Sequence, residues 1–186
     1  TLYPGYTQAL PSYCALTLEA ERELLTQNVR LPMGSPVSVP LPDDGSCLFK
    51  TAADLNIYPF CLDRVSAEAA PFKTPVPCPV DNAEAVIRLE FSCSDPEAQF
   101  SQLQVDDLDL YVRGFEQSAD SLIELLLTST KAIVLSDLDG RRHCAIESER
   151  MFSRVADPEF QLLPRYGNQF LGYDLLRDFF TYPDKG

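Results

Sequence analysis

Fifteen prolines spread through 186 residues constrain the fold of this chain more than any other feature of its sequence. Proline lacks a backbone N–H and fixes φ at about −65°, so it interrupts helix interiors and is tolerated in turns and at strand edges. Only eight glycines accompany the prolines, so the loops are expected to be stiff. The sequence therefore favours short strands joined by rigid loops over long helices.

Short segments alternate apolar and polar residues with the period of a half-buried strand. The alternation predicts strands within residues 12–20, 85–93 and 108–115. Residues 29–34 and 37–39, with the turn Asp43-Asp44-Gly45, predict a short strand pair, and residues 47–51, 55–59 and 61–65 are expected to be further extended runs. Asp139-Gly140 between two apolar runs predicts a hairpin over residues 133–146. Residues 69–82 are rich in proline and predict an extended loop.

Two segments have helical spacing. Ser118 to Ser121 would cap a short amphipathic helix over residues 122–127, and a second helix is expected at about 171–180, ended by Pro183. Together the elements predict an α+β, mainly β fold: an antiparallel, β-sandwich-like single domain of residues 1–186, with two or three short helices including a C-terminal one. A chain of this length can bury about 70% of its unfolded surface, which provides a core without disulfides.

The charge balance excludes several partners. Fifteen basic residues against 28 acidic ones give a net charge of −13, which repels nucleic acid and anionic membrane surfaces. No apolar run approaches the roughly 20 residues of a membrane span. We therefore expect no nucleic-acid binding and no membrane insertion, and a basic protein surface as any electrostatic partner.

The six cysteines do not have the spacing of a metal site. None lies within four residues of another, and the only histidine, His143, is next to Cys144, so the two would face opposite sides of a strand. That arrangement also argues against a Cys–His nucleophile. We expect no metal or other cofactor and reduced, buried thiols, although an even count leaves disulfides possible.

One segment resembles an enzyme motif. Residues 133–140 end in Asp137-x-Asp139-Gly140, as in haloacid-dehalogenase-type phosphatases, where the first Asp attacks phosphorus and the second moves a proton. That chemistry also needs a parallel sheet, a magnesium cluster and a lysine, and the sequence instead returns at once as a second strand. We therefore predict no catalytic residue, with the phosphatase as the weakest alternative function.

The C-terminal helix carries the candidate site. Leu175, Leu176, Phe179 and Phe180 fall on one broad apolar face, beside Tyr173 and Tyr182. Packing into the core is the plain interpretation. The alternative is that these four residues face a protein partner.

Four landmarks in order along the chain resemble the TssF (also VasA or ImpG) family of type VI secretion baseplate components. They are residues 2–6 with 10–12, residues 49–51, residues 57–60, and residues 170–185 with Leu163-Pro164 upstream. Tyr58 replaces the family's usual Trp, and Asp178-Phe179 replaces Glu-Tyr.

The resemblance implies an internal fragment of a structural protein with no catalysis. It further implies a baseplate wedge in the bacterial cytoplasm, docked at the inner-membrane complex, that binds TssG, TssE, TssK and the VgrG hub and primes the phage-tail-like tube and contractile sheath. Strand content and tyrosines leave a second alternative, a carbohydrate- or ligand-binding β-sandwich with a tyrosine-lined groove.

Overall fold

The computed structural model describes residues 9–16, 18, 25–43, 45–95, 97–113, 118–154, 157, 160–163 and 170–182. They fall into two compact units, the first drawn from Thr1–Pro59, Ser94–Asp107 and Arg154–Gly186 and the second from Phe60–Cys93 and Leu108–Ser153. The expectation of a single domain stays a prediction.

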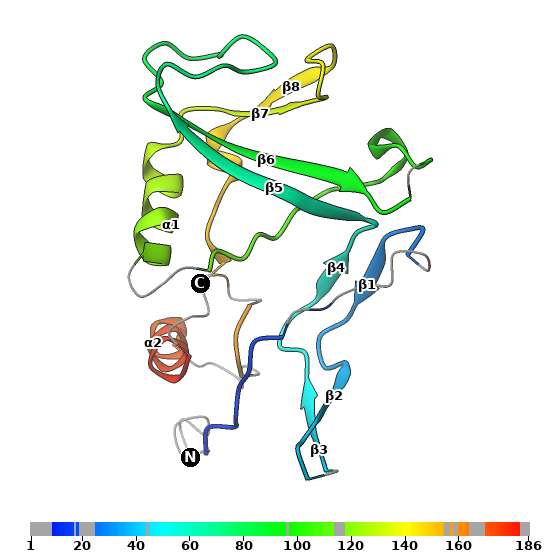
Figure 1. Cartoon of the computed structure of the whole chain (residues 1–186). Helices are drawn as coiled ribbons and strands as arrows, with labels where there is room; N and C mark the ends of the chain where they lie inside the picture. The colour runs from blue at the N-terminus through cyan, green and yellow to red at the C-terminus, as the bar shows by residue number, and fades with distance from the viewer. Residues whose placement is uncertain are drawn as a thin grey trace. The chain divides into compact units, whose positions relative to one another are not determined.

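The mainly β, α+β class is confirmed (Figure 1). The strands are β1 (Val29–Leu31), β2 (Pro36–Pro40), β3 (Ser46–Lys50), β4 (Leu55–Ile57), β5 (Phe60–Ala69), β6 (Ala85–Cys93), β7 (Ile133–Ser136) and β8 (His143–Ile146). The helices are α1 (Ser118–Ser129) and α2 (Leu171–Thr181), with 3-10 turns at Phe100–Gln102 and Ser148–Arg150. Within the described residues the strands form antiparallel pairs β1–β4, β2–β3, β5–β6 and β7–β8.

The first unit contains one long hairpin with an interruption. In β1–β4, Leu31 pairs with Leu55, and in β2–β3, Pro36 pairs with Lys50. Pro36 is five residues after Leu31, and Lys50 is five residues before Leu55. The register is therefore the same on both sides of the interruption. Odd-numbered positions carry the apolar residues Val29, Leu31, Val37, Val39, Cys47, Phe49, Leu55 and Ile57. Even-numbered positions are polar or proline apart from Leu48.

The second unit contains the longest ladder, β5–β6, and a β-bulge keeps its apolar residues together. Leu62 pairs with Phe91 and Arg64 pairs with Glu90, so Asp63 is an extra residue in β5. Without it, Leu62 and Val65 would lie on opposite faces, since they are three residues apart. The bulge places both on the face of Leu89. Several residues of this face are exposed, among them Val65 and Leu89.

The predicted hairpin over residues 133–146 is confirmed as β7–β8. Its loop is longer than a two-residue turn, because Ser136 pairs with His143. Gly140 has φ +69° and donates its N–H to the Asp137 carbonyl at 3.1 Å. Helix α1 is also confirmed, but it begins at Ser118, so Ser118 to Ser121 form its first turn instead of preceding it.

Two predicted strands are wrong where the structure describes them. Residues 12–16 and 108–113 have no strand structure, and Leu16, Leu108 and Tyr111 are exposed. Alternation describes which side chains could share a face, but a strand also needs a neighbouring strand to satisfy its backbone. The remainder of each segment, residues 17, 19–20 and 114–115, lies outside the described residues.

Burial is slight throughout the described part of the chain. Its buried hydrophobic residues are Ala53 and Val76. The six cysteines are free thiols, and the expectation that they are buried is wrong, because three are exposed and three are half-buried. His143 and Cys144, expected on opposite sides of a strand, are both exposed. Many large apolar side chains of the described residues are therefore exposed.

Candidate protein interface

Helix α2 turns charged side chains inward. Asp174 and Asp178, one helical turn apart, are 1% and 2% exposed. Arg177 lies between them, with its Nη2 at 3.4 Å from Asp174 Oδ1 and 3.6 Å from Asp178 Oδ1. Buried carboxylates are costly without a cation, so Arg177 compensates for both. Asp174 also lies in the first turn, where the helix dipole favours negative charge.

Neighbouring segments complete this polar cluster. The Leu162 N–H donates to Asp178 Oδ2 at 3.0 Å, which ties the chain before α2 to the helix. Burial raises the pKa of Tyr13, the charge of Asp178 raises it further, and Arg177 opposes this. The tyrosine hydroxyl and the Gln161 amide are buried without a hydrogen-bond partner among the described residues. The helix is thus held through its polar side.

The opposite side of α2 is apolar and open. Leu176, Phe179 and Phe180 are 56%, 57% and 79% exposed, and Tyr173 is exposed beside them. Leu175 is half-buried. The four predicted site residues therefore divide into three on the open side and one at its border. That they face a protein partner stays a prediction.

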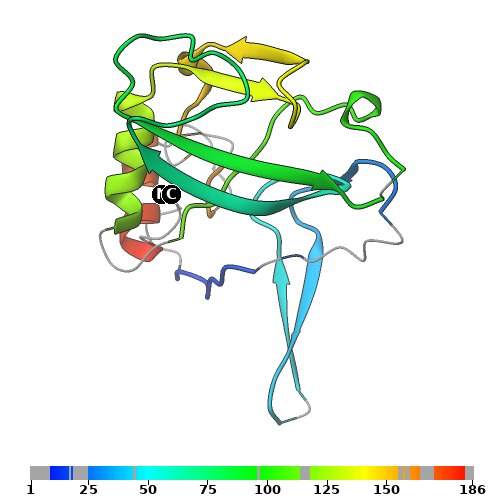
Figure 2. The same cartoon turned by 45° about the horizontal axis from the view of Figure 1, so that its top comes forward.

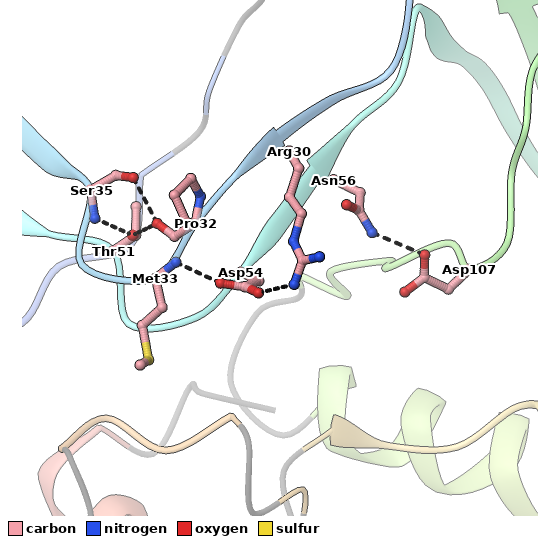
Figure 3. Close-up of polar contacts among 8 residues, drawn as sticks. All are labelled: Arg30, Pro32, Met33, Ser35, Thr51, Asp54, Asn56 and Asp107. Atoms are coloured by element: carbon pink, nitrogen blue, oxygen red, sulfur yellow. Dashed lines mark hydrogen bonds and ion pairs between the residues drawn. The ribbon is translucent and has the colours of Figure 1, made fainter.

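A compact hydrogen-bonded joint connects β1–β4 to β2–β3 (Figure 3). Thr51 Oγ1 accepts the Ser35 N–H at 3.1 Å and donates to the Pro32 carbonyl at 2.9 Å. Ser35 Oγ donates to the same carbonyl at 2.7 Å, and Gly34, with φ +84°, donates its N–H to the Thr51 carbonyl at 2.9 Å. One hydroxyl thus fixes both sides of the interruption.

Asp54 extends the joint towards β1. Its carboxylate accepts the Met33 N–H at 2.6 Å and pairs with Arg30. The Met33 N–H and then the Arg30 guanidinium lower the pKa of Asp54, and the hydrogen bond to Asp54 raises the pKa of Arg30. Both side chains are open to solvent, so the ion pair itself contributes little to stability, and the hydrogen bond from Met33 is the more local constraint on the hairpin.

A shallow polar pocket of about 260 Å³ lies beside the β1–β4 ladder. Asp107 Oδ1 accepts the Asn56 amide at 3.1 Å and the Tyr58 hydroxyl at 3.0 Å, and the hydroxyl also donates to the Asp107 carbonyl at 2.7 Å. Burial and then the hydrogen bond to Asp107 raise the pKa of Tyr58. Tyr58 is the single aromatic residue of its lining, unlike the tyrosine-lined groove that the ligand-binding alternative requires.

The phosphatase-like aspartates are placed in a hairpin loop. Asp137 Oδ2 accepts the Arg142 N–H at 3.2 Å, and exposed Asp139 lies 3.9 Å from the Arg141 Nε. In the described part of the chain, no three His, Cys, Asp or Glu side chains are grouped so as to hold a metal ion. The loop geometry accounts for Asp137 as a turn residue.

The polar side of α2 was not foreseen from the sequence. The signal was present, because Asp174 and Asp178 are spaced i, i+4 opposite the apolar face. Amphipathic helices normally bury their apolar side, so the spacing alone would place these carboxylates in solvent. The family-like landmarks correspond to structural positions: Thr51 is in the joint, Tyr58 contacts Asp107, and residues 170–182 form α2 and its ends.

Comparison with known proteins gives two matches in one family. The family model described as Type VI secretion system, TssF, matches residues 1–186. Type VI secretion system component TssF1 of Pseudomonas aeruginosa is 27% identical over 193 residues, which cover 97% of this chain and 30% of that protein. The chain thus spans under a third of the length of this curated relative. No solved structure matches this chain.

Proposed function

The chain belongs to the TssF family of the type VI secretion system, and from this premise we propose that it is a structural domain of the secretion baseplate that acts by binding other proteins. In this proposal it has no catalytic role. It contacts TssG, TssE and TssK in a wedge around the VgrG hub, in the cytoplasm at the inner-membrane complex, and the assembled baseplate primes tube and sheath polymerisation. In the described residues, neither helix is long and apolar enough to cross a bilayer.

The observation that carries the proposal is the orientation of α2. A helix whose carboxylates are buried and whose Leu176 and Phe180 are exposed cannot gain stability from that apolar side within the described chain. Apolar positions at i and i+4 on an exposed helix face are a common protein-recognition pattern. Large exposed apolar patches mark interaction surfaces. We therefore assign the open side of α2 to a protein partner.

Co-expression with TssG tests the proposal. The wild-type protein is expected to co-purify with TssG, and the double variant Leu176→Ser, Phe180→Ser is expected to reduce recovered complex at least tenfold. Leu138→Ser is the matched control, because Leu138 is 86% exposed in the β7–β8 loop, and it should leave recovery unchanged. Circular dichroism should show the same helix content in all variants.

Two outcomes contradict the proposal. Absence of co-purification with TssG, TssE or TssK would remove the structural role. Equal recovery of complex with the α2 variant and the Leu138 variant would remove α2 as the binding surface while leaving the role in place.

A phosphatase would instead show magnesium-dependent turnover of a generic phosphate ester that Asp137→Asn abolishes.

A further inference from the structure

The hydrogen-bond pattern of β2–β3 determines which backbone groups point outward. The Thr51 N–H donates to the Ser35 carbonyl at 3.0 Å, and the Leu41 N–H donates to the Gly45 carbonyl at 2.9 Å. These are hydrogen-bonded pairs at the two ends of the ladder. Such pairs alternate with open ones along an antiparallel ladder. The open pairs are therefore Pro36 with Lys50, Ser38 with Leu48, and Pro40 with Ser46.

The two outer edges of this hairpin are not equivalent. On the β2 edge, the outward positions are Pro36, Ser38 and Pro40, and two of the three have no N–H to donate. On the β3 edge, Ser46, Leu48 and Lys50 each keep both an N–H and a carbonyl. Within the described strands none lies beside β3 except β2 (Figure 2). Of the two outer edges of this hairpin, the β3 edge is therefore the one that can accept a full added strand.

The side chains next to this edge define what would be added. Val37, Val39, Cys47 and Phe49 are half-buried on one face of the hairpin, and Leu48 is 78% exposed on the other. A strand beside β3 would extend the first face if it placed apolar residues at alternate positions. The joint at Thr51 and Asp54 holds the hairpin at a fixed register, so the outward N–H and carbonyl groups of β3 are already positioned for an added strand.

The length and charge of the edge select the source of the strand. β3 has five residues, so pairing alone is weak and favours a strand already held nearby by other contacts in one assembly. A second copy of this chain is disfavoured because both copies would carry −13. β3 itself has no acidic residue and ends in Lys50.

We propose that the outer edge of β3 pairs with an extended strand, apolar at alternate positions, from another protein subunit of the secretion complex. This inference rests on the proposed function. It adds a second contact, made by backbone hydrogen bonds on the hairpin, to the side-chain contact assigned to α2. Sheet extension of this kind uses main-chain groups for affinity and alternate side chains for specificity.

Hydrogen exchange and one pair of proline variants test it. The protein is compared alone and in its co-purified complex with TssG, TssE and TssK. The amides of Ser46, Leu48 and Lys50 should exchange at least tenfold more slowly in the complex. Leu48→Pro should reduce recovered complex at least tenfold, because it removes an outward N–H without removing a ladder bond. Ser38→Pro, at the paired position on β2, should leave recovery unchanged, and Leu48→Thr should stay within threefold of wild type.

The possible failures are distinguishable. Unchanged exchange of the three amides in a complex that does form would overturn this inference alone. Equal effects of Leu48→Pro and Ser38→Pro would also overturn it, because general hairpin disruption would then explain the loss. Protection of the same amides in a dimer of the protein alone would assign the edge to a second copy. Absence of any complex would overturn the inference together with the proposed function.

Discussion

Among the glycines in the described residues, Gly140 is the one whose replacement is most restricted by geometry. Its φ of +69° belongs to the left-handed region, and an added Cβ would lie 2.3 Å from the Pro75 carbonyl oxygen. Gly34 has a similar φ of +84° but open space around the Cβ position. Gly140→Ala is therefore expected to lower the free energy of unfolding by about 2–5 kcal/mol, from conformational strain plus a steric clash.

Gly34→Ala should cost only the conformational part, about 1–2 kcal/mol. Urea denaturation followed by circular dichroism measures both variants. Equal losses for the two substitutions would show that the Pro75 contact does not restrict residue 140.

Arg177 is expected to be the charged residue most important for stability in the described chain. Replacing it with methionine keeps the length of the side chain but removes the guanidinium that lies 3.4 Å from Asp174 Oδ1 and 3.6 Å from Asp178 Oδ1. Breaking a buried charge cluster in this way costs about 3–5 kcal/mol. Arg141→Met is the control, because that side chain is 83% exposed, and it should change stability by no more than about 0.5 kcal/mol. Similar stability of both variants in thermal and urea denaturation would refute the compensating role of Arg177.

Asp54 makes the hairpin joint sensitive to acid. Its pKa in the folded chain is lower than its ordinary value of 3.8, so its contribution is complete above that value and is lost as pH falls through the lower folded pKa. The Met33 amide, which donates to this carboxylate, should report the loss. We expect its proton chemical shift to titrate with a midpoint below 3.8 in NMR spectra. Asp54→Asn should abolish that titration, and a midpoint at or above the ordinary value would contradict the assignment.

At the scale of elements, Thr51 determines how firmly the two ladders are joined. Thr51→Val removes the hydroxyl that serves both Ser35 and Pro32, whereas Thr51→Ser keeps it. The valine variant should lose about 1–2 kcal/mol, and the β2–β3 amides should exchange faster, because both partners lose their contact. The serine variant should exchange like wild type. If valine and serine behave alike, the methyl group and not the hydroxyl stabilises the joint.

Local pattern predicted the elements whose partners are close in sequence. The hairpin over residues 133–146 and the segments from 29 to 57 form ladders because a turn brings each alternating run back beside the other. Residues 12–16 and 108–113 have comparable alternation but no described strand beside them. β5 was predicted only in part, because residues 66–69, which continue the strand beyond the predicted segment 61–65, contain no large apolar side chain to mark the alternation.

The candidate site was predictable in its residues but not in its orientation. The spacing of Leu176 and Phe180 identifies an apolar helix face, and amphipathicity alone assigns such a face to the core. In the structure the carboxylate side of α2 is buried and the apolar side is exposed. This orientation depends on Arg177 and the Leu162 N–H, which offset the desolvation of the two carboxylates. Those contacts join different segments of the chain, so the periodicity of one segment cannot predict them. The joint at Thr51 and the open β3 edge likewise depend on register, which emerges only when the hairpin is formed.

For the whole molecule, the net charge of −13 affects how quickly partners associate more than how tightly they remain bound. A basic partner is attracted over roughly 8–10 Å at physiological ionic strength, and salt screens this attraction. We therefore expect the association rate constant with the proposed partner TssG to fall at least fivefold between 0.05 and 0.5 M NaCl. The dissociation rate constant should change less than twofold, because the contacts assigned to α2 and β3 are apolar and backbone contacts.

Biolayer interferometry over a salt series separates the two rate constants. Wild-type protein is compared with a variant in which exposed Asp139 and Glu149 are both changed to their amides, which reduces the negative charge by two without touching α2 or β3. The variant should associate more slowly at low salt and like wild type at high salt. An association rate that is independent of salt would refute charge attraction, and a dissociation rate that rises steeply with salt would place ion pairs, and not apolar contacts, at the centre of the interface.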